Sequence, residues 1–485
     1  MTENVNAVVN TTPTESAPNG FATLGLAQEL LMAVADLGFT QPTAVQLQAI
    51  PLAMKGEHQA GYADLMVSSQ TGSGKTAAFL LPVLDTLIQQ KAAEEEAERM
   101  AFEAAKAQAE SEGKAAPKKP KRKNPLLARH FKPAVPGALV LCPTRELAQQ
   151  VAQEAIDLVR HCRGLRVANV VGGMPYQTQI AKLQNADLVV ATPGRLLDLQ
   201  RSGQLILNQV QFLVVDEADR MLDLGFADDL AEINHLTIER HQTMMFSATF
   251  APRIQQLATR VMREPQRLTI DSPQQKHNNI EQRLYWADTP EHKRQLLDHW
   301  LRDASIDQAI VFASTQIECD GLAEELQQVG FSAVALHGAL SQGLRNRRLS
   351  ALRDGRVQIL VATDVAARGI DVPTITHVFN FGLPMKSEDY VHRIGRTGRA
   401  GRQGLAVTFA EFRDRRKIMD IEHYSQQRFK ASVVEGLEPK RPVYDEAPRG
   451  GNGRGRGHGG PGAGRGGFGG NRSGGFAGNR GGFGA

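Results

Sequence analysis

The sequence predicts an α/β protein in which two tandem domains are each built on a parallel β-sheet. Continuous apolar runs, such as FLVV at 212–215 and AIVF at 309–312, are typical of strands buried on both faces of a sheet. A polar or Gly-rich cluster and then a helical period follow these runs, which indicates βαβ units. The pattern stops at the polar stretch SPQQKHNN, residues 272–279, and then restarts, so two such domains are expected.

The length of 485 residues allows about three units at roughly 150 residues per domain. We expect a disordered leader at 1–20, a first domain at 21–270, a linker at 271–282, a second domain at 283–437 and a disordered tail at 438–485. The leader is polar and rich in Thr, Asn and Pro, a composition that cannot form a packed core.

The cysteine count and the hydropathy pattern exclude several classes of protein. Cys142, Cys162 and Cys319 are odd in number and form no CxxC pair, so neither a disulfide framework nor a zinc site is expected. The N-terminus has no basic start followed by an apolar run, which argues against a signal peptide. No stretch approaches 18 apolar residues, so we expect a cytoplasmic protein without a membrane span.

An insert at residues 91–133 interrupts the first domain. It begins with the acidic, helix-favouring stretch KAAEEEAERMAFEAAKAQAESE and continues with GKAAPKKPKRKNPLLARHFKP, which holds eight Lys or Arg and no acids. We favour a solvated surface excursion. The alternative is an extra contact to RNA phosphates, through Lys118, Lys119, Lys121, Arg122 and Lys123.

The tail is strongly biased in composition. Residues 447–485 hold 19 Gly, six Arg, three Phe and no acids, too little apolar surface to fold. Arg can bind phosphates and Phe can stack on bases without a fixed geometry, so we favour RNA binding over a passive solubilising role.

A phosphate-binding loop follows the strand expected at DLMV. It consists of Ser69, Gln70, Thr71, Gly72, Ser73, Gly74, Lys75 and Thr76, and a helical period follows it. In that strand–loop–helix context the glycines let backbone N–H groups close around phosphates at a helix N-terminus. Lys75 is expected to reach the β- and γ-phosphates, and the Thr76 hydroxyl to bind Mg²⁺. Ser69 takes the place of the usual first glycine.

Two further sets of charged residues complete a predicted nucleotide site. Asp216 and Glu217 follow the run FLVV directly, where Asp216 suits a Mg²⁺ ligand and Glu217 a base for the attacking water. The alternative is a solvated turn, which would explain the charge of these residues but not their position directly after a buried strand. In the second domain Arg393, Arg396 and Arg399 fall within seven residues, and an arginine reaching across a cleft could neutralise the γ-phosphate.

On these motifs the sequence resembles the DEAD-box ATP-dependent RNA helicases, most closely the bacterial RhlE-type branch, over about residues 21–437. The resemblance implies two RecA-like P-loop NTPase domains. It also implies an RNA-dependent ATPase that locally unwinds RNA duplexes and remodels ribonucleoproteins when ATP closes the two domains. ATP and Mg²⁺ are the implied cofactors.

The resemblance also assigns site residues. Phe21, Gln41 and Gln46 would recognise adenine, Asp371 would contact the ribose, and Arg396 and Arg399 would act as arginine fingers. The residues that would couple the ATP site to RNA and the domains to one another are Asp219, Ser247, Thr249, Arg368, His392 and Arg393, the last two through interdomain contacts. The RNA contacts would be Pro143, Thr144, Arg145, Gly172, Gly173, Thr192, Pro193, Gly194, Arg195, Thr315, Gln342, Arg345 and Thr363.

Contacts of this kind bind the phosphates and sugars of RNA, so they predict little preference for particular RNA sequences. The expected partners are single-stranded and duplex RNA, with ribosomal precursors and the RNA-degradation machinery as candidates by family analogy. The core is expected to be monomeric and to bind no membrane. The sequence departs from the family at Gly382, where Asp is usual, at Cys142, at extra residues 57–63 and at the insert.

Three alternatives come from other classes of protein. A DNA translocase of the same superfamily is disfavoured by the Gln46 motif and the segment HRIGRTGR. A non-catalytic RNA clamp is disfavoured because the predicted catalytic residues are intact. A P-loop kinase or GTPase would need no second α/β domain and leaves the Gly/Arg tail unexplained.

Overall fold

The computed structural model describes most of the chain between residues 20 and 440. The described ranges are 20–54, 61–69, 72–112, 132–248, 250–270, 279–367, 370, 372, 374–398 and 402–440. The described residues belong to one compact unit. The leader up to residue 19 and the tail from residue 441 lie outside the described residues.

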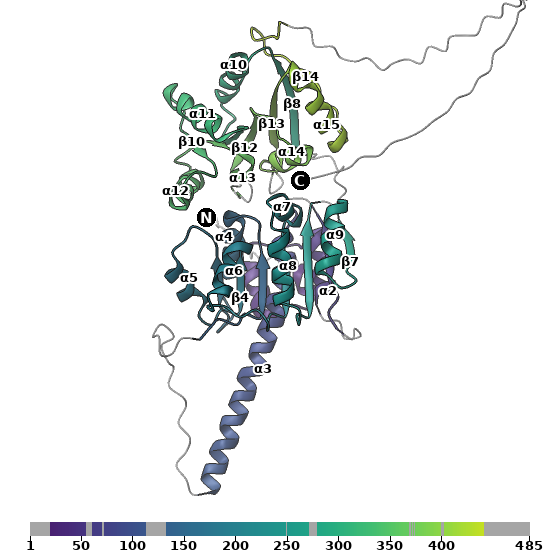
Figure 1. Cartoon of the computed structure of the whole chain (residues 1–485), viewed down its shortest axis with the longest axis vertical. Helices are drawn as coiled ribbons and strands as arrows, with labels where there is room; N and C mark the ends of the chain where they lie inside the picture. The colour runs from purple at the N-terminus through teal and green to yellow at the C-terminus, as the bar shows by residue number, and fades with distance from the viewer. Residues whose placement is uncertain are drawn as a thin grey trace, which may run out of the picture. The chain divides into compact units, whose positions relative to one another are not determined.

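Two seven-stranded sheets organise this unit, and every strand pair in them is parallel (Figure 1). The first sheet comprises β1 (Leu65–Ser68), β2 (Ala138–Leu141), β3 (Val167–Val170), β4 (Leu188–Ala191), β5 (Phe212–Val215), β6 (Gln242–Ser247) and β7 (Gln266–Thr269). The second comprises β8 (Ile280–Ala287), β9 (Gln308–Phe312), β10 (Ala333–Leu336), β11 (Ile359–Ala362), β12 (Ile375–Asn380), β13 (Gly404–Glu411) and β14 (Ala431–Ser432). The predicted fold class is confirmed.

The two sheets share one strand order. The first runs β3-β4-β2-β5-β6-β1-β7 and the second β10-β11-β9-β12-β13-β8-β14. Since β8 to β14 correspond in sequence order to β1 to β7, the domains are structural repeats. Strand β8 begins at Ile280, so the last three residues of the predicted linker 271–282 belong to the second sheet.

Helices cover both faces of each sheet. Those of the first domain are η1 (Gly20–Leu24), α1 (Gln28–Asp36), α2 (Ala44–Ala53), α3 (Lys75–Ser111), α4 (Arg145–Leu158), α5 (Tyr176–Leu183), α6 (Pro193–Arg201), α7 (Ala218–Asp223), α8 (Ala227–Leu236) and α9 (Pro252–Val261). Those of the second are α10 (Pro290–Leu301), α11 (Gln316–Gln328), α12 (Gln342–Arg353), α13 (Asp364–Ala367), α14 (Ser387–Ile394), η3 (Phe412–Asp414) and α15 (Arg415–Ser425).

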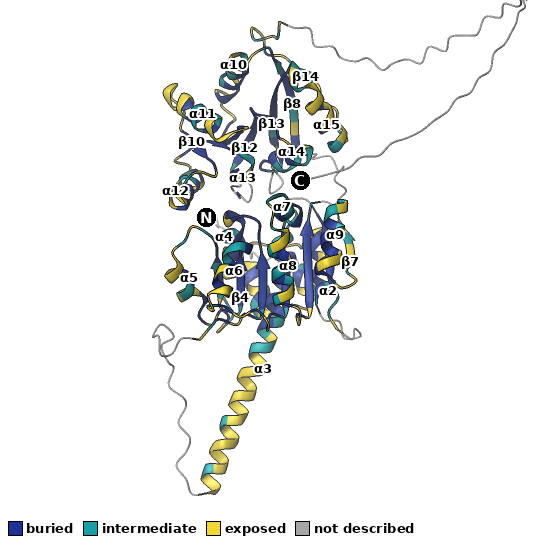
Figure 2. Cartoon of the chain, in the orientation of Figure 1, coloured by how far each residue is buried: buried dark blue, intermediate teal, exposed yellow. Residues whose placement is uncertain are grey.

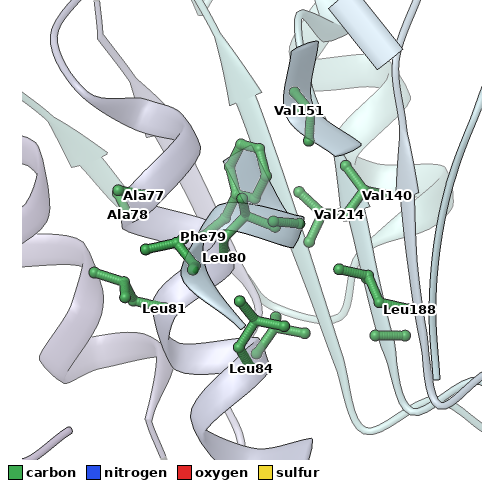
Figure 3. Close-up of a cluster of buried hydrophobic side chains, with 14 of the residues drawn as sticks. Ala77, Ala78, Phe79, Leu80, Leu81, Leu84, Val140, Val151, Leu188 and Val214 are labelled. Carbon is green, nitrogen blue, oxygen red and sulfur yellow. The ribbon is translucent and has the colours of Figure 1, made fainter. Parts of the chain in front are cut away.

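Each sheet has an apolar core on both faces because successive side chains of a strand point in opposite directions. In β1, Leu65 and Val67 join the cluster under α3 and α4, while Met66 joins the cluster on the other face. Figure 3 shows the first of these clusters, where Phe79 of α3 lies near strand residues such as Val214. The continuous apolar runs of the sequence therefore reflect burial on two faces.

Helix α3 joins the phosphate-binding loop to the predicted insert. Its first turns are buried, and from residue 92 nearly every side chain is exposed, as Figure 2 shows in yellow. At about 1.5 Å per residue the exposed part extends roughly 30 Å. A bond between Lys91 Nζ and Asp187 Oδ1 at 2.8 Å holds its base. The basic residues of the insert, 118–123, lie outside the described residues. Within the described ranges, no helix is both long and apolar enough to cross a membrane.

Candidate functional site

The predicted motifs gather where the strands of each sheet end. The phosphate-binding loop follows β1, Pro143 comes shortly after β2, and Asp216 follows β5 directly. Parallel strands all end at one edge of the sheet, so these residues share that edge. In the second domain the same edge carries the residues after β9 and β11, including Thr315 and Thr363.

The phosphate-binding loop depends on two left-handed glycines. Gly72 and Gly74 have φ angles of 83° and 88°, which residues with a Cβ rarely adopt. Lys75 is the first residue of α3, and its Nζ donates to the Ser69 carbonyl at 3.0 Å. The Ser69 and Ser73 hydroxyls lie 2.5 Å apart. Gln70 and Thr71 lie outside the described residues.

The predicted adenine motif packs directly on this loop. Gln46 Oε1 accepts from the Thr43 backbone N–H at 2.9 Å, and Gln46 Nε2 donates to the Gly74 carbonyl at 3.1 Å. A Cβ on Gly74 would lie only 2.6 Å from Nε2, so the glycine is needed for this contact as well. Phe21 is buried in the core cluster under α3, and Gln41 is exposed. The adenine-binding roles of these residues stay a prediction.

The acidic pair has an unusual backbone. Asp216 Oδ1 accepts from the Glu217 N–H at 2.9 Å. Glu217 has φ 48° and ψ 54°, a left-handed conformation that costs energy in any residue other than glycine. Such strain persists where the surrounding structure fixes it, and it is concentrated at functional sites. Here it places Glu217 between the end of β5 and the start of α7.

Burial changes the acidity of Asp216. Asp216 is 4% exposed, and this burial raises its pKa to about 7. The positive charge of Lys75 opposes the rise, and the negative charge of Glu217 adds to it. A buried carboxylate of this kind favours a bound cation, and together with the Thr76 hydroxyl it offers the hard oxygen ligands that Mg²⁺ prefers. The residues present therefore fit a Mg²⁺ site.

We expect Asp216→Asn to stabilise the protein when nucleotide and Mg²⁺ are absent. Since the folded-state pKa is raised, the folded protein holds a proton between about pH 4 and pH 7 that the unfolded chain has lost, and wild-type stability falls as pH rises through that window. Urea unfolding in EDTA should show a gain of up to a few kcal/mol at pH 8 and little at pH 4. An equal gain at both pH values would contradict this origin.

Residues of both domains line one pocket beside the acidic pair. They are Glu217, Asp219, Arg220, Asp223, Glu388, Asp389, His392 and Arg396. His392 Nε2 of the second domain lies 3.8 Å from Asp219 Oδ2 of the first, and the coupling role of the two residues stays a prediction. Arg396 is 4% exposed and donates through Nε to the His392 carbonyl and through one NH₂ group to the Ile370 carbonyl. The sequence did not predict Arg220, Asp223, Glu388 or Asp389.

The remaining predicted residues of the nucleotide site are Ser247, which the structure describes, and four that it does not. Ser247 is buried, its carbonyl accepts from the Ser69 N–H at 3.2 Å, and its hydroxyl has no hydrogen-bond partner among the described residues. Thr249, Arg368, Asp371 and Arg399 lie outside the described residues.

Arg393 makes several hydrogen bonds within the second domain. It was expected to make an interdomain contact, but its guanidinium binds both oxygens of Asp364, at 2.5 and 2.8 Å, within the second domain. It also donates to Asn380 and to the Gly382 carbonyl, and it lies over the ring of Phe312. A buried arginine with its donors taken in this way fixes the loop after β12, and its predicted interdomain role stays a prediction.

The same loop explains why glycine stands at position 382. A Cβ there would lie 2.6 Å from the Ser314 backbone nitrogen and even closer to its hydroxyl oxygen. We expect Gly382→Ala to lower the free energy of unfolding by about 1–3 kcal/mol, since backbone has to move to make room. Urea denaturation measures this, with Gly343→Ala, where a Cβ meets nothing within 4 Å, as the control. Equal stability of the two variants would contradict the packing argument.

A second pocket collects most of the predicted RNA contacts. It is lined by Pro143, Thr144, Arg145, Glu146, Gly172, Thr192, Gly194, Arg195, Leu224, Phe226, Gly338, Arg345 and Val365. Two more predicted RNA contacts, Gly173 and Gln342, lie beside Arg145, and Gln342 accepts a hydrogen bond from Arg145. Pro193, Thr315 and Thr363 are not among the lining residues. Leu224, Phe226, Gly338 and Val365 were not predicted, because no sequence pattern marks them as part of a binding site.

Polar contacts in this pocket join the two domains. Glu146 accepts from Arg345 at 2.8 Å and from Gln342 at 3.2 Å, and Arg145 donates to Gln342 at 3.0 Å. The buried Glu146 carboxylate therefore orients two predicted RNA contacts, Gln342 and Arg345. Arg195 donates to the Met174 carbonyl, and its guanidinium lies 4.4 Å from the centre of the Tyr176 ring.

Comparison with known proteins finds related sequences over most of the chain. The DEAD/DEAH box helicase family matches residues 43–257, and the helicase conserved C-terminal domain matches residues 292–401. The chain is 38% identical over 432 residues to the ATP-dependent RNA helicase SrmB of Escherichia coli, covering 89% of this chain and 87% of that protein. It is 41% identical over 403 residues to the ATP-dependent RNA helicase DeaD of the same organism, covering 83% of this chain and 56% of that protein.

Solved structures agree. Saccharomyces cerevisiae Dbp5 bound to RNA and ADP BeF3 is similar with a TM-score of 0.69 and 29% identity, over 86% of this chain and 95% of that one. The helicase Mss116 bound to ssRNA and UDP-BeF is similar with a TM-score of 0.70 and 26% identity, over 87% and 82%. The RhlE-type branch stays a prediction. The chain belongs to the DEAD-box family and is an ATP-dependent RNA helicase.

Proposed function

We propose that the nucleotide site is assembled from both domains and that it hydrolyses ATP only when they are closed. The observation that carries this is the shared pocket, in which Glu217 of the first domain and Arg396 of the second line the same space. The two residues belong to different domains, so separating the domains would divide the pocket. The proposal thereby links ATP hydrolysis to domain position.

Each residue then has a distinct task. Lys75 and the loop glycines hold the phosphates, and Gln46, Phe21 and Gln41 hold the adenine. Glu217 accepts a proton from the attacking water, and Arg396, with Arg399, neutralises charge that develops on the γ-phosphate. Mg²⁺, held by Thr76 and Asp216, would supply charge neutralisation between the phosphates. The contact between Asp219 and His392 forms only when the domains are closed, so it links the two halves of the site.

The second pocket is proposed to bind the phosphate–sugar backbone of single-stranded RNA. Arg145 and Arg195 supply positive charge in the first domain, and Gln342 and Arg345 supply donors in the second. Closure brings these groups together and fixes the path of one strand, which a stacked duplex cannot follow. A few base pairs therefore open locally, without long translocation.

The decisive experiment measures ATP hydrolysis with and without single-stranded RNA, with single-stranded DNA as competitor. We expect stimulation by RNA and weak competition by DNA, because the site recognises ribose as well as phosphate. Equal competition by DNA would favour a translocase. Nucleotide binding without hydrolysis would favour a non-catalytic clamp.

We further propose that the tail adds RNA affinity. Deleting residues 447–485 removes six arginines and three phenylalanines, so RNA binding should weaken and its salt dependence should flatten. Each phosphate that the tail neutralises should account for about 0.7 of the slope of log K against log salt for single strands. ATPase activity at saturating RNA should survive. Unchanged affinity at every salt concentration would contradict the proposal.

The physiological RNA is proposed from family analogy alone. Ribosomal precursors and the RNA-degradation machinery are the candidate targets, with the core acting as a monomer. Sequencing of RNA crosslinked to the protein in cells would test both candidates together.

A further inference from the structure

Four charged side chains form a cluster between the domains that no predicted motif includes. Asp223 ends α7 and Arg253 lies in α9, both in the first domain, while Lys386 and Glu388 lie at the start of α14 in the second. We call these four residues the charge cluster. Its contacts are short, and they alternate in sign around the group.

Two of the contacts cross from one domain to the other. Lys386 Nζ lies 2.5 Å from Asp223 Oδ1, and an Arg253 guanidinium nitrogen lies 3.1 Å from Glu388 Oε2. Within the first domain, another nitrogen of Arg253 lies 2.5 Å from Asp223 Oδ1. Arg253 therefore binds one carboxylate on each side of the interface, and Asp223 binds one cation on each side.

Partial burial makes these contacts stronger than isolated surface pairs. The side chain of Asp223 is 10% exposed, and that of Glu388 is 28% exposed. An isolated exposed ion pair contributes little to stability, but a network with fixed geometry contributes more. Reversing the charges on one side would turn both crossing contacts from attractive to repulsive.

The charge cluster borders the pocket beside Asp216 and Glu217. Asp223 and Glu388 line it together with Glu217 and Arg396. Helix α7 begins directly after Glu217, and α14 carries His392 and ends just before Arg396. The cluster thus ties together the two short helices whose ends hold the proposed base and the proposed arginine finger.

We propose that the charge cluster positions α14 on α7 and thereby favours the closed arrangement in which Arg396 faces Glu217. Its four members are positioning residues, because they act through the contacts that they make with one another across the interface. The inference rests on the proposed two-domain site and adds a set of residues that controls its closure.

Paired charge swaps test this. The first-domain swap combines Asp223→Arg with Arg253→Glu, and the second-domain swap combines Lys386→Glu with Glu388→Lys. Each swap keeps or forms an opposite-charge pair within its own domain but makes both crossing contacts repulsive. The fourfold variant carries both swaps and restores attraction across the interface.

RNA affinity is measured with and without a non-hydrolysable ATP analogue. Each single-domain swap should weaken nucleotide-dependent RNA binding about tenfold and leave nucleotide-independent binding unchanged, and the fourfold variant should return to within about threefold of wild type. ATPase assays should show a raised KM for RNA with a smaller change in kcat. Failure of the fourfold variant to recover, with its fold intact by circular dichroism, would overturn the proposal.

One further variant tests a single crossing contact, and another serves as a control. Lys386→Met removes one crossing contact from a half-exposed side chain, and it should weaken nucleotide-dependent binding about two- to threefold. The control swap, Arg201→Glu with Glu232→Arg, inverts an exposed pair inside the first domain and should change nothing. If wild type shows no RNA-stimulated ATPase, the proposed function fails. If wild type is active and every swap behaves like it, only the charge cluster inference fails.

Discussion

Glu217→Gln is expected to lower ATP hydrolysis by about 10²- to 10⁴-fold, the usual contribution of a general base. The substitution keeps the size of the side chain and its capacity to hydrogen-bond to water, but an amide cannot accept the proton. The backbone N–H that bonds to Asp216 is unaffected. Binding of ATP and RNA should therefore persist, and the complex should remain closed on RNA for longer.

Single-turnover hydrolysis and RNA dissociation measure the two parts of this prediction. Glu232→Gln, which changes an exposed acid on α8, is the matched control and should hydrolyse ATP like wild type. If Glu217→Gln also hydrolyses like wild type, the proton goes elsewhere and the assigned base is wrong. If both ATP and RNA affinity collapse, the left-handed backbone at Glu217 depends on its carboxylate, and the residue has a structural role as well.

The sequence predicted central strands better than edge strands. The predicted runs DLMV, FLVV and AIVF became strands β1, β5 and β9, because a strand buried on both faces has few polar positions. The strands absent from the prediction are β3, β7, β8 and β14. Strands β3, β7 and β14 lie at sheet edges, and β7 is mostly exposed, so no apolar run marks them. Strand β8 mixes exposed and buried positions and has no continuous apolar run.

The site was predictable where one short segment holds a whole function. The phosphate-binding loop and the acidic pair each follow a strand, so sequence order alone places them at the ligand-binding edge. Contacts between distant segments were not predictable. The charge cluster joins residues from α7, α9 and α14, and the bonds of Arg393 to Asp364 depend on how α14 packs. A basic residue in a motif does not reveal which carboxylate it meets.

Arg396→Lys is expected to lower hydrolysis about 10³-fold or more, the range found when an arginine finger is removed. The guanidinium is held by the His392 and Ile370 carbonyls, which fixes its plane at the pocket. Lysine keeps the charge, but it has no planar fork and cannot make both bonds while facing a phosphate. ATP affinity in the absence of RNA should change little, because the adenine and phosphate contacts belong to the first domain.

The measurement is single-turnover hydrolysis at saturating RNA, beside nucleotide binding by fluorescence without RNA. Arg413→Lys, an exposed arginine near α15, is the control and should behave like wild type. If Arg396→Lys lost ATP affinity in the open protein as much as hydrolysis, Arg396 would contact the nucleotide before closure. Closure would then not assemble the site. If instead hydrolysis alone falls, the second domain acts only in the closed state, and RNA can control the reaction by controlling closure.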